Sequence, residues 1–435
     1  MTCCTSNVNP PSGFHRHDDR WSVDFCIEFL SHARVRLLAE NVKGNSLVTM
    51  TASPDKPIEM TDDADFVHTG PGTLSGRYMR MFWHPVYVAD QLKPGHAVPI
   101  QIMSEKFTLY RGEGGSPYVV DFRCAHRGTQ LSLGWVEEEC IRCFYHGWKY
   151  NGTGQCVEQP AEDESFAGKV RIRSYPTQDY LGLIFAYLGE GVAPPFPRYS
   201  QLEGEGVLEV SSYVRLCNYF NTLENGVDQA HVPFTHARSN FTKFGLNWDI
   251  PKITAEETEY GVAMYGTRSN GVSRVNHYLM PNILYIKGSP DESAEKWREA
   301  FAWRVPIDDV SHTSFNLSLV HITGDAAERY RERRKQLRAI AAKLPSARDM
   351  ADAVLAGRCS IHDIEDRPDI VNIQDHVAQE GQGAIPDRHA ERLGRSDTAI
   401  ILMRKIWLRE LRALAEGRPL KKWSCPEGLL ATSGV

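Results

Sequence analysis

The sequence lacks several features that would assign it to a special class of protein. No run of about 18 apolar residues occurs in its 435 residues, so a membrane-spanning helix is not expected. The polar N-terminus has no apolar core segment, which argues against a secretion signal and favours a cytoplasmic protein. A net charge of −6 gives no general electrostatic reason to bind nucleic acid or an anionic membrane.

Cysteine is also sparse, with ten residues spread through a long chain. A reducing compartment would keep these residues as thiols or metal ligands rather than disulfides. Three of them nevertheless lie with two histidines in the stretch CAHRGTQLSLGWVEEECIRCFYHGW, residues 124 to 148. This stretch could form a zinc clip, a disulfide loop or a redox centre, and the choice decides the function of the protein.

The length of the chain favours two or three domains. We expect residues 1–49 to be an N-terminal extension that is unlike the rest of the chain. Translation could instead begin at Met50, or Trp21 to Glu40 could form an amphipathic surface helix. Residues 50–78 form a polar lead-in.

Short alternating apolar runs with Gly and Pro at the joints predict an antiparallel β domain over residues 79–190. The proline-rich EGVAPPFPRY ends this domain. Residues 191–435 are expected to hold a helix over about 218–232, strands over about 252–323 and a charged helix over 326–344.

A last helix has the clearest pattern. Ser396 can cap it, Gly417 can end it, and its apolar residues recur on one face. These apolar residues are Ile400, Met403, Trp407, Leu411 and Leu414. Because strands and helices are segregated along the chain rather than alternating, the fold class is α+β.

The first candidate metal site is the cysteine- and histidine-rich stretch. Cys124 and His126 form one pair, Cys143 and His146 form a second pair, and sixteen residues lie between the two pairs. A common zinc finger groups two cysteines before two histidines, whereas each pair here mixes one of each and follows a strand. A Rieske [2Fe–2S] cluster needs this set, because two cysteines bind one iron and two histidines the other.

The surrounding residues resemble the Rieske signature, with Cys-Ala-His-Arg-Gly, Gly134 and Cys-Phe-Tyr-His-Gly-Trp in order. Two histidine ligands place the cluster potential in a range of roughly −150 to +300 mV, suited to passing electrons onward. Cys140 departs from the signature. It would suit a zinc knuckle with Cys143, or it could be a buried thiol without a ligand role.

A second candidate site lies in NYFNTLENGVDQAHVPFTH, residues 218 to 236. Glu224, Asp228 and His231 recur on one face of the expected helix. His236 would point elsewhere on a continuous helix, but Pro233 should break the helix and bring it back beside His231. Two histidines and one carboxylate can form a facial triad for non-haem Fe(II). A helix end with two structural histidines is the alternative.

With a Rieske domain before it, this motif resembles the catalytic motif of the Rieske non-haem iron oxygenases, over the chain from about residue 79 to the C-terminus. The resemblance implies a helix-grip-like catalytic domain with an antiparallel sheet and flanking helices, and a mononuclear iron bound by His231, His236 and a distant aspartate. The segment VNIQDHVAQEGQG places that aspartate at Asp375. Other candidates are Asp363, Asp366, Asp369 and Asp387.

The same resemblance implies that Asp228 connects a catalytic-iron histidine to a Rieske histidine across a subunit boundary. Such a bridge requires a head-to-tail homotrimer, or stacked trimers, in which the cluster of one subunit serves the iron of its neighbour. A carboxylate bonded to both imidazoles would orient them and couple their protonation to the redox state. A purely structural carboxylate at a helix end is the alternative.

We therefore expect a terminal oxygenase that takes electrons from NAD(P)H through a reductase and hydroxylates a substrate with dioxygen. The C-terminal segment NIQDHVAQEGQGAIPDRHAERLGRSD resembles phthalate, chlorobenzoate and phenoxybenzoate oxygenases. This resemblance implies an aromatic carboxylate substrate and a reductase with FMN and a plant-type iron–sulfur cluster. An arginine should then pair with the substrate carboxylate. Candidates for it are Arg238, Arg268, Arg274 and Arg304.

Two other functions remain open. The same irons could carry out mono-oxygenation, including O- or N-demethylation of a methoxy or N-methyl substrate. Outside enzymes, the chain could be a Rieske electron-transfer or metal-storage protein with a vestigial second site, although the complete set of two histidines and a carboxylate argues against this.

Overall fold

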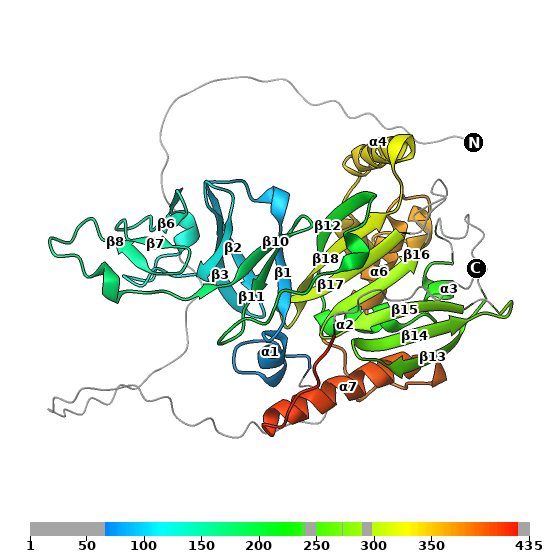
Figure 1. The fold of residues 1–435 in the computed structure, drawn as a ribbon. Helices are drawn as coiled ribbons and strands as arrows, with labels where there is room; N and C mark the ends of the chain where they lie inside the picture. The colour runs from blue at the N-terminus through cyan, green and yellow to red at the C-terminus, as the bar shows by residue number, and fades with distance from the viewer. Residues whose placement is uncertain (1–65, 238, 240–248, 272, 289–297, 425–435) are drawn as a thin grey trace, which may run out of the picture. The chain divides into compact units, whose positions relative to one another are not determined.

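The computed structural model describes residues 66–237, 239, 249–271, 273–288 and 298–424. The expected extension 1–49, with its helix from Trp21, lies outside the described residues. So do Met50 and the first part of the lead-in. The described residues form four antiparallel sheets with helices grouped mainly in the C-terminal half (Figure 1).

The N-terminal half is built mainly of short strands. Its elements are α1 (Leu74–Met79), β1 (Trp83–Val88), β2 (His96–Ile102), β3 (Glu105–Arg111), β4 (Pro117–Asp121), β5 (Trp135–Glu137), β6 (Cys140–Arg142), β7 (Lys149–Asn151), β8 (Cys156–Glu158), β9 (Ser174–Tyr175), β10 (Thr177–Tyr180) and β11 (Leu183–Tyr187). The strands form sheets in the orders β1-β11-β10, β2-β3-β4-β9 and β5-β6-β7-β8. The expected antiparallel β region is confirmed.

The C-terminal half contains one large sheet and most of the helices. Its elements are β12 (Val207–Arg215), α2 (Tyr219–Val227), α3 (Val232–Thr235), β13 (Lys252–Glu257), β14 (Gly261–Thr267), β15 (Ser273–Leu279), β16 (Ile283–Gly288), β17 (Arg298–Asp308), β18 (Ser311–Val320), α4 (Gly324–Ala341), α5 (Ala347–Leu355), α6 (Ile370–Glu380) and α7 (Thr398–Ala415). The sheet order is β12-β18-β17-β16-β15-β14-β13. This arrangement confirms the α+β class.

One face of the seven-stranded sheet forms the main hydrophobic core. Phe301, Trp303 and Leu317 are fully buried on this face. Trp303 meets Phe185 of β11 edge to face, with ring centroids 5.7 Å apart. Because side chains alternate along a strand, the residues between them point to the opposite face. The three-stranded sheet and the seven-stranded sheet therefore share one core.

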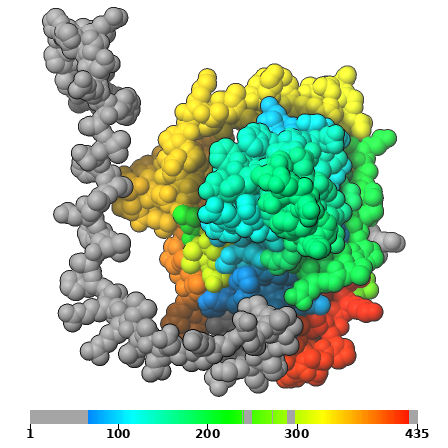
Figure 2. Space-filling view, turned by 90° about the vertical axis from the view of Figure 1, so that its left-hand side faces the viewer, coloured from blue at the N-terminus to red at the C-terminus, as the bar shows by residue number. Residues whose placement is uncertain are grey.

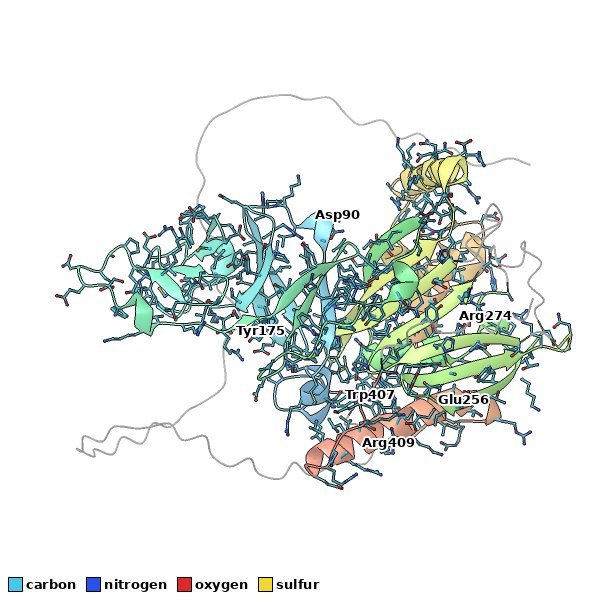
Figure 3. The ribbon with its side chains drawn as sticks, viewed as in Figure 1. Asp90, Tyr175, Glu256, Arg274, Trp407 and Arg409 are labelled. Carbon is cyan, nitrogen blue, oxygen red and sulfur yellow. The ribbon has the colours of Figure 1, made fainter. Side chains whose placement is uncertain are left out.

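Helices cover the opposite face of the sheet. Trp407 of α7 is fully buried, and its Nε1–H donates to the hydroxyl of Tyr278 on β15 at 2.8 Å. Figure 3 shows Trp407 and Arg409 on this helix beside the sheet. In α2, Gly226 lies against Leu284 of β16 so closely that a Cβ would come within 3.0 Å of it. The helix-covered face is the one on which the candidate iron site lies.

Two of the expected helix boundaries are wrong. The helix expected over 218–232 is two helices, because α2 ends at Val227 and α3 begins at Val232. Pro233 does not break a helix. It lies in the first turn of α3, where its missing N–H is not needed for a helical hydrogen bond.

The last helix begins one residue later than its sequence suggests. Ser396 lies in a short 3-10 segment and does not cap α7, whose N-cap is Asp397. Gly417 ends the helix as expected, with a φ of 65°. The backbone N–H groups of Arg418 and Gly417 bond back to Ala413 and Leu414, which satisfies the last carbonyls. No helix of the described residues is long and apolar enough to cross a membrane.

Candidate metal centres

Two loops of nearly identical construction carry the Rieske-like residues. In the first, the N–H of Cys124 bonds to the carbonyl of Thr129, and the N–H of Gly128 bonds to the carbonyl of Cys124. In the second, the N–H of Cys143 bonds to the carbonyl of Trp148, and the N–H of Gly147 bonds to the carbonyl of Cys143. The spacings along the sequence are the same in both loops. Each loop therefore presents one cysteine and one histidine in a matching backbone frame.

Glycine is required at the corner of each loop. Gly128 has a φ of +75° and Gly147 a φ of +73°, which side-chain-bearing residues rarely adopt. A Cβ on Gly147 would also come within 2.8 Å of Pro160. Gly134 is restricted by space, because its Cβ would lie 1.8 Å from the carbonyl oxygen of Arg142. These glycines hold the two loops close together.

The four side chains separate into a cysteine pair and a histidine pair. Cys124 and Cys143 are buried free thiols, and burial raises the pKa of Cys124. The rings of His126 and His146 lie 4.5 Å apart and are half-buried. Among the described residues, no three of these four ligand atoms gather as they would around one ion. Two separated pairs suit the two irons of a [2Fe–2S] cluster better than a single zinc ion.

Neighbouring aromatic groups orient the ligand residues. His126 stacks on Trp148 at 4.5 Å with an interplanar angle of 8°. Its buried Nδ1 has no hydrogen-bond partner among the described residues, so this atom is available as a ligand. The Sγ of Cys124 lies 3.3 Å from the hydroxyl of Tyr150, a contact that would stabilise a thiolate. The four residues fit the cluster.

Cys140 lies on β6, opposite Glu137 and Asn151, with its thiol partly exposed. It is a free cysteine, so the disulfide alternative is wrong for it and for the two cysteines of the loops. No zinc site that combines it with Cys143 and a third ligand occurs among the described residues.

The second centre is assembled from three separate elements. His231 precedes α3, His236 ends α3, and Asp375 lies within α6. One ligand atom from each residue lies within 4.8 Å of the others. The short helix α3 produces this convergence, because it places the two histidines at its two ends. The break in the chain that allows it is at Asp228, where α2 stops.

Hydrogen bonds prepare His236 for metal binding. The Nδ1–H of His236 donates to the side-chain oxygen of Gln374 at 3.0 Å. This bond leaves Nε2 without a proton, facing the Oδ1 of Asp375 at 3.5 Å. Buried Asp375 Oδ1 forms no hydrogen bond within the described residues, which is the environment that a cation requires. The three residues fit a mononuclear metal ion.

The charges at this site favour the ionised ligand form of Asp375 and raise the proton affinity of His231. Burial would raise the pKa of Asp375, but the neighbouring His236 imidazole and the Arg215 guanidinium outweigh it, so that the pKa is lowered. Burial would lower the pKa of His231, but Asp228 and Asp375 outweigh it and the pKa is raised. The carboxylate is therefore ionised at neutral pH.

The other candidate aspartates lie elsewhere. Asp363 and Asp387 accept local backbone N–H bonds, and Asp369 pairs with Arg367. Asp366 is exposed. None of the four joins a cluster of candidate ligands in the described part of the chain.

Asp228 lies beside the metal triad rather than within it. Its Oδ2 is 3.6 Å from the Nδ1 of His231, and its Oδ1 accepts the N–H of Ala230 at 2.7 Å. The sequence suggested that Asp228 and His231 share one helical face. This expectation is wrong, because Asp228 is the C-cap of α2. Its side chain is 22% exposed, so it can still reach a group outside the chain.

Glu224 has a role that the sequence did not reveal. Its buried carboxylate accepts hydrogen bonds from Arg388 and Arg404, at 3.0 and 2.6 Å. These bonds tie α2 to α7 and to the segment before it. The apolar pattern of α7 predicted the helix but gave no signal for this ion pair.

The four candidate arginines are dispersed. Arg238 lies outside the described residues. Arg268 and Arg274 are near each other, toward the end of the sheet where β15 begins, and Figure 3 shows Arg274 there. Arg304 is buried within β17. Arg215 was not among the arginines that the sequence offered as candidates for carboxylate binding. The alternation of β12 nevertheless places it on the same side of the strand as Tyr213.

Comparisons with known proteins agree with this fold. The family profile for the Rieske [2Fe-2S] domain matches residues 82–176. The oxygenase subunit of 5,5'-dehydrodivanillate O-demethylase from a Sphingobium species is 29% identical over 81% of this chain and 80% of its own length. The oxygenase subunit of 3-chlorobenzoate-3,4-dioxygenase from Comamonas testosteroni is 32% identical over 62% of this chain and 64% of its own length.

A solved complex between oxygenase and ferredoxin in carbazole 1,9a-dioxygenase has a similar fold. The TM-score is 0.59 with 19% identity, over 82% of this chain and 95% of that one. Domain, fold and relatives together define an iron–sulfur oxidoreductase. The chain carries a Rieske [2Fe–2S] domain and is similar over most of its length to oxygenase subunits of the aromatic ring-hydroxylating type. Its cofactors are a Rieske [2Fe–2S] cluster and a mononuclear non-haem iron.

Proposed function

We propose that this protein is the terminal oxygenase of a Rieske system and hydroxylates an aromatic carboxylate of the phthalate or substituted benzoate type. Cys124, His126, Cys143 and His146 hold the cluster, and His231, His236 and Asp375 hold the catalytic iron. The cluster supplies electrons one at a time, and an iron with three protein ligands activates dioxygen. The observation that carries this proposal is the convergence of two histidines and one carboxylate from separate elements.

The residues around the iron site hold its ligands in place. Gln374 fixes the tautomer and the ring orientation of His236. Asn225 contacts the Nε2 of His231 at 3.5 Å. The exposed fractions of the His231 and Asp375 side chains are 18% and 24%, so a small molecule can approach the triad. Substrate and iron can therefore meet without unfolding of α6.

With both centres loaded, electrons would reach the iron from a neighbouring subunit in a head-to-tail homotrimer, or in stacked trimers. Asp228 connects His231 to a Rieske histidine of that neighbour. Exposed aromatic side chains surround the loops of the cluster, among them Trp135, Phe144 and Tyr145, with exposed fractions of 52 to 58%. Figure 2 views the chain from the side of the cyan and green residues that include these loops. Such a surface suits docking to another protein.

The electron-transfer partner is a reductase with FMN and a plant-type iron–sulfur cluster, or a ferredoxin of the kind found with the carbazole enzyme. The system works in the cytoplasm. A substrate panel with a surrogate reductase tests the proposed function. Benzoates and phthalates should give dihydroxylated products, coupled to oxygen uptake, and the absence of product from every aromatic acid would contradict the proposal.

Demethylation is the second candidate function, and the O-demethylase relative favours it. Methoxybenzoates belong in the same panel. Formaldehyde and a phenol would indicate demethylation, whereas a diol would indicate dioxygenation. A protein that only transfers electrons would contain no iron beyond the two atoms of the cluster and would consume no oxygen under reductant.

A further inference from the structure

The helix-covered face of the large sheet has an unusual floor. On β17, Phe301 and Trp303 are buried in the core, whereas Ala300 and Ala302, which point to the helices, are only half-buried. On β18, Asn316 and Ser318 of the same face are also half-buried. The cross-strand register sets Ala302 opposite Asn316 and Ala300 opposite Ser318. Small side chains that keep some accessibility beneath a layer of helices leave room for a bound molecule.

This floor lies next to the metal triad. The side chain of Gln229, two residues before His231, donates to the backbone carbonyl of Met264 on β14. On the other side, the ring of His376, which follows Asp375, lies 5.7 Å from the ring of Tyr213 on β12. The segments that carry the metal ligands therefore contact the sheet at two places, at β14 on one side of the floor and at β12 on the other.

Arg304 stands at one end of the floor. It is 8% exposed, and its Nη1–H donates to the side-chain oxygen of Asn316 at 3.3 Å. Its Nε–H has no partner, and its guanidinium forms no ion pair, within the described residues. A buried cation with so few partners is costly, unless an anion neutralises it.

A phenol lies beside this guanidinium. Ser314 of β18 is directly opposite both Arg304 and Tyr213 in the sheet, so that all three side chains share one row of the helix-covered face. Burial would raise the pKa of Tyr213, but the charges of Arg304 and Arg215 outweigh it and the pKa is lowered. The hydroxyl and the guanidinium can thus bind the same anion.

The other arginines near the site differ from Arg304. Arg215 is 1% exposed, but Gln379, Thr222 and Asn372 receive its hydrogen bonds, so it joins α2 to α6. Arg274 is exposed at the end of the sheet, and other arginines lie nearby. The Nε of Arg215 also lacks a hydrogen-bond partner, but its Nη atoms are held by α2 and α6, whereas the guanidinium of Arg304 bonds only to Asn316 within the described residues and lies on the floor.

We propose that Arg304, assisted by the hydroxyl of Tyr213, binds the carboxylate of the aromatic substrate and thereby sets the specificity of the enzyme. The ring then lies over Ala302 and Ala300, with its edge toward the iron ligands. A guanidinium binds a carboxylate through two parallel hydrogen bonds, which fixes the orientation of the ring as well as its affinity. This inference rests on the proposed function and names the residues that recognise its substrate class.

Calorimetric binding to the iron-loaded protein tests the proposal without turnover. The probes are benzoate, phthalate and 4-methoxybenzoate, each paired with its neutral primary amide. Arg304→Gln should weaken binding of the acids by about tenfold or more and leave the amides unchanged. Tyr213→Phe should weaken acid binding by a few fold, and Arg304→Lys should retain part of it. Arg274→Gln is the matched comparison at the other end of the sheet.

Thermal melting separates recognition from a structural role. Because Arg304 forms no ion pair with an acid among the described residues, Arg304→Gln should melt no lower than the wild-type protein in the absence of ligand. A structural arginine would lower the melting temperature instead. If Arg304→Gln failed to fold, Tyr213→Phe and Arg304→Lys would still report the difference between acid and amide.

Several results would overturn the proposal: equal affinity for acids and amides, no acid binding by the wild-type protein, or a larger loss in Arg274→Gln than in Arg304→Gln. Failure of the proposed function is recognised separately. In that case neither acids nor amides stimulate oxygen uptake with a reductase. If Arg304→Gln keeps oxygen uptake and the same preference for acids, this inference fails while the proposed function stands.

Discussion

His231, His236 and Asp375 are the proposed iron ligands, and they come from separate elements of the fold. Two of them lie at the ends of a four-residue helix, and the third comes from a helix more than a hundred residues later. Each of the two histidines is supported by a neighbour: Asp228 beside His231, and Gln374 bonded to His236. The supporting residues should affect turnover more than metal content, whereas the ligands should affect both.

Asp375→Ala should abolish iron retention at the catalytic site, because two histidines alone hold Fe(II) weakly. Turnover should fall by more than about a hundredfold, beyond what loss of a supporting residue costs. The absorption and paramagnetic resonance spectra of the cluster should not change. Asp366→Asn, which alters an exposed acid of the same region, is the control. Full activity in Asp375→Ala would refute the assignment of this ligand.

Asp228→Asn should retain both metals and lose turnover by roughly 10- to 100-fold. The amide oxygen can still accept the N–H of Ala230, so the local turn is preserved. What is lost is the negative charge between two imidazoles. Metal analysis together with single-turnover reduction of the iron checks this prediction, and an unchanged rate of electron transfer would argue against a bridge.

At the scale of the elements, the helix layer is held to the site by the buried carboxylate of Glu224. Its partners Arg388 and Arg404 come from the segment before α7 and from α7 itself. The exposed fractions of the Glu224 and Arg388 side chains are 9% and 5%, so water screens this pair little. The position of α2, and through it the loop that carries His231, depends on these ion pairs.

Glu224→Gln should lower the free energy of unfolding by about 3 kcal/mol, since it leaves the buried Arg388 charge without a counter-ion among the described residues, whereas Arg404 keeps its ion pair with Glu391. Iron at the catalytic site should also be held less tightly, because α2 precedes His231. Glu328→Gln is the matched control, as its ion pair with Arg331 is exposed and should contribute less than about 1 kcal/mol. Equal thermal stability of the two variants would contradict this role of Glu224.

At the scale of the whole molecule, the proposed function requires more than one chain. The cluster loops carry exposed aromatic residues, and Asp228 is partly exposed beside the iron site. Both features suit an assembly in which one subunit donates electrons to the next. The head-to-tail trimer stays a prediction, as do the domain boundary near residue 190 and the roles of the ligand residues.

Complementation between two inactive variants tests the assembly. Cys124→Ser should lack the cluster and Asp375→Ala the catalytic iron, so each homo-oligomer should be inactive. Co-expressed together, they should form mixed oligomers in which an intact cluster faces an intact iron site of the neighbour. Activity should then be partly restored. Mixed oligomers, verified by native mass spectrometry, that stay inactive would contradict transfer between subunits.

The sequence by itself determined the local features. Alternating residues predicted the strands, because side chains alternate across a sheet. The Cys-x-His and Cys-x-x-His pairs predicted the cluster loops, because both ligands of each pair belong to one turn. The prediction of one helix over 218–232 was wrong, because the local pattern did not reveal that α2 ends at Val227, with Asp228 as its cap.

Only the tertiary structure decided which distant groups meet. It brought Asp375, rather than its four competitors, beside the two histidines, and it placed Arg304 and Tyr213 in one row of the sheet. It also turned Glu224 away from the metal and toward two arginines. Such contacts depend on how whole elements pack, and residues near one another in the sequence carry little information about packing between elements far apart in the chain.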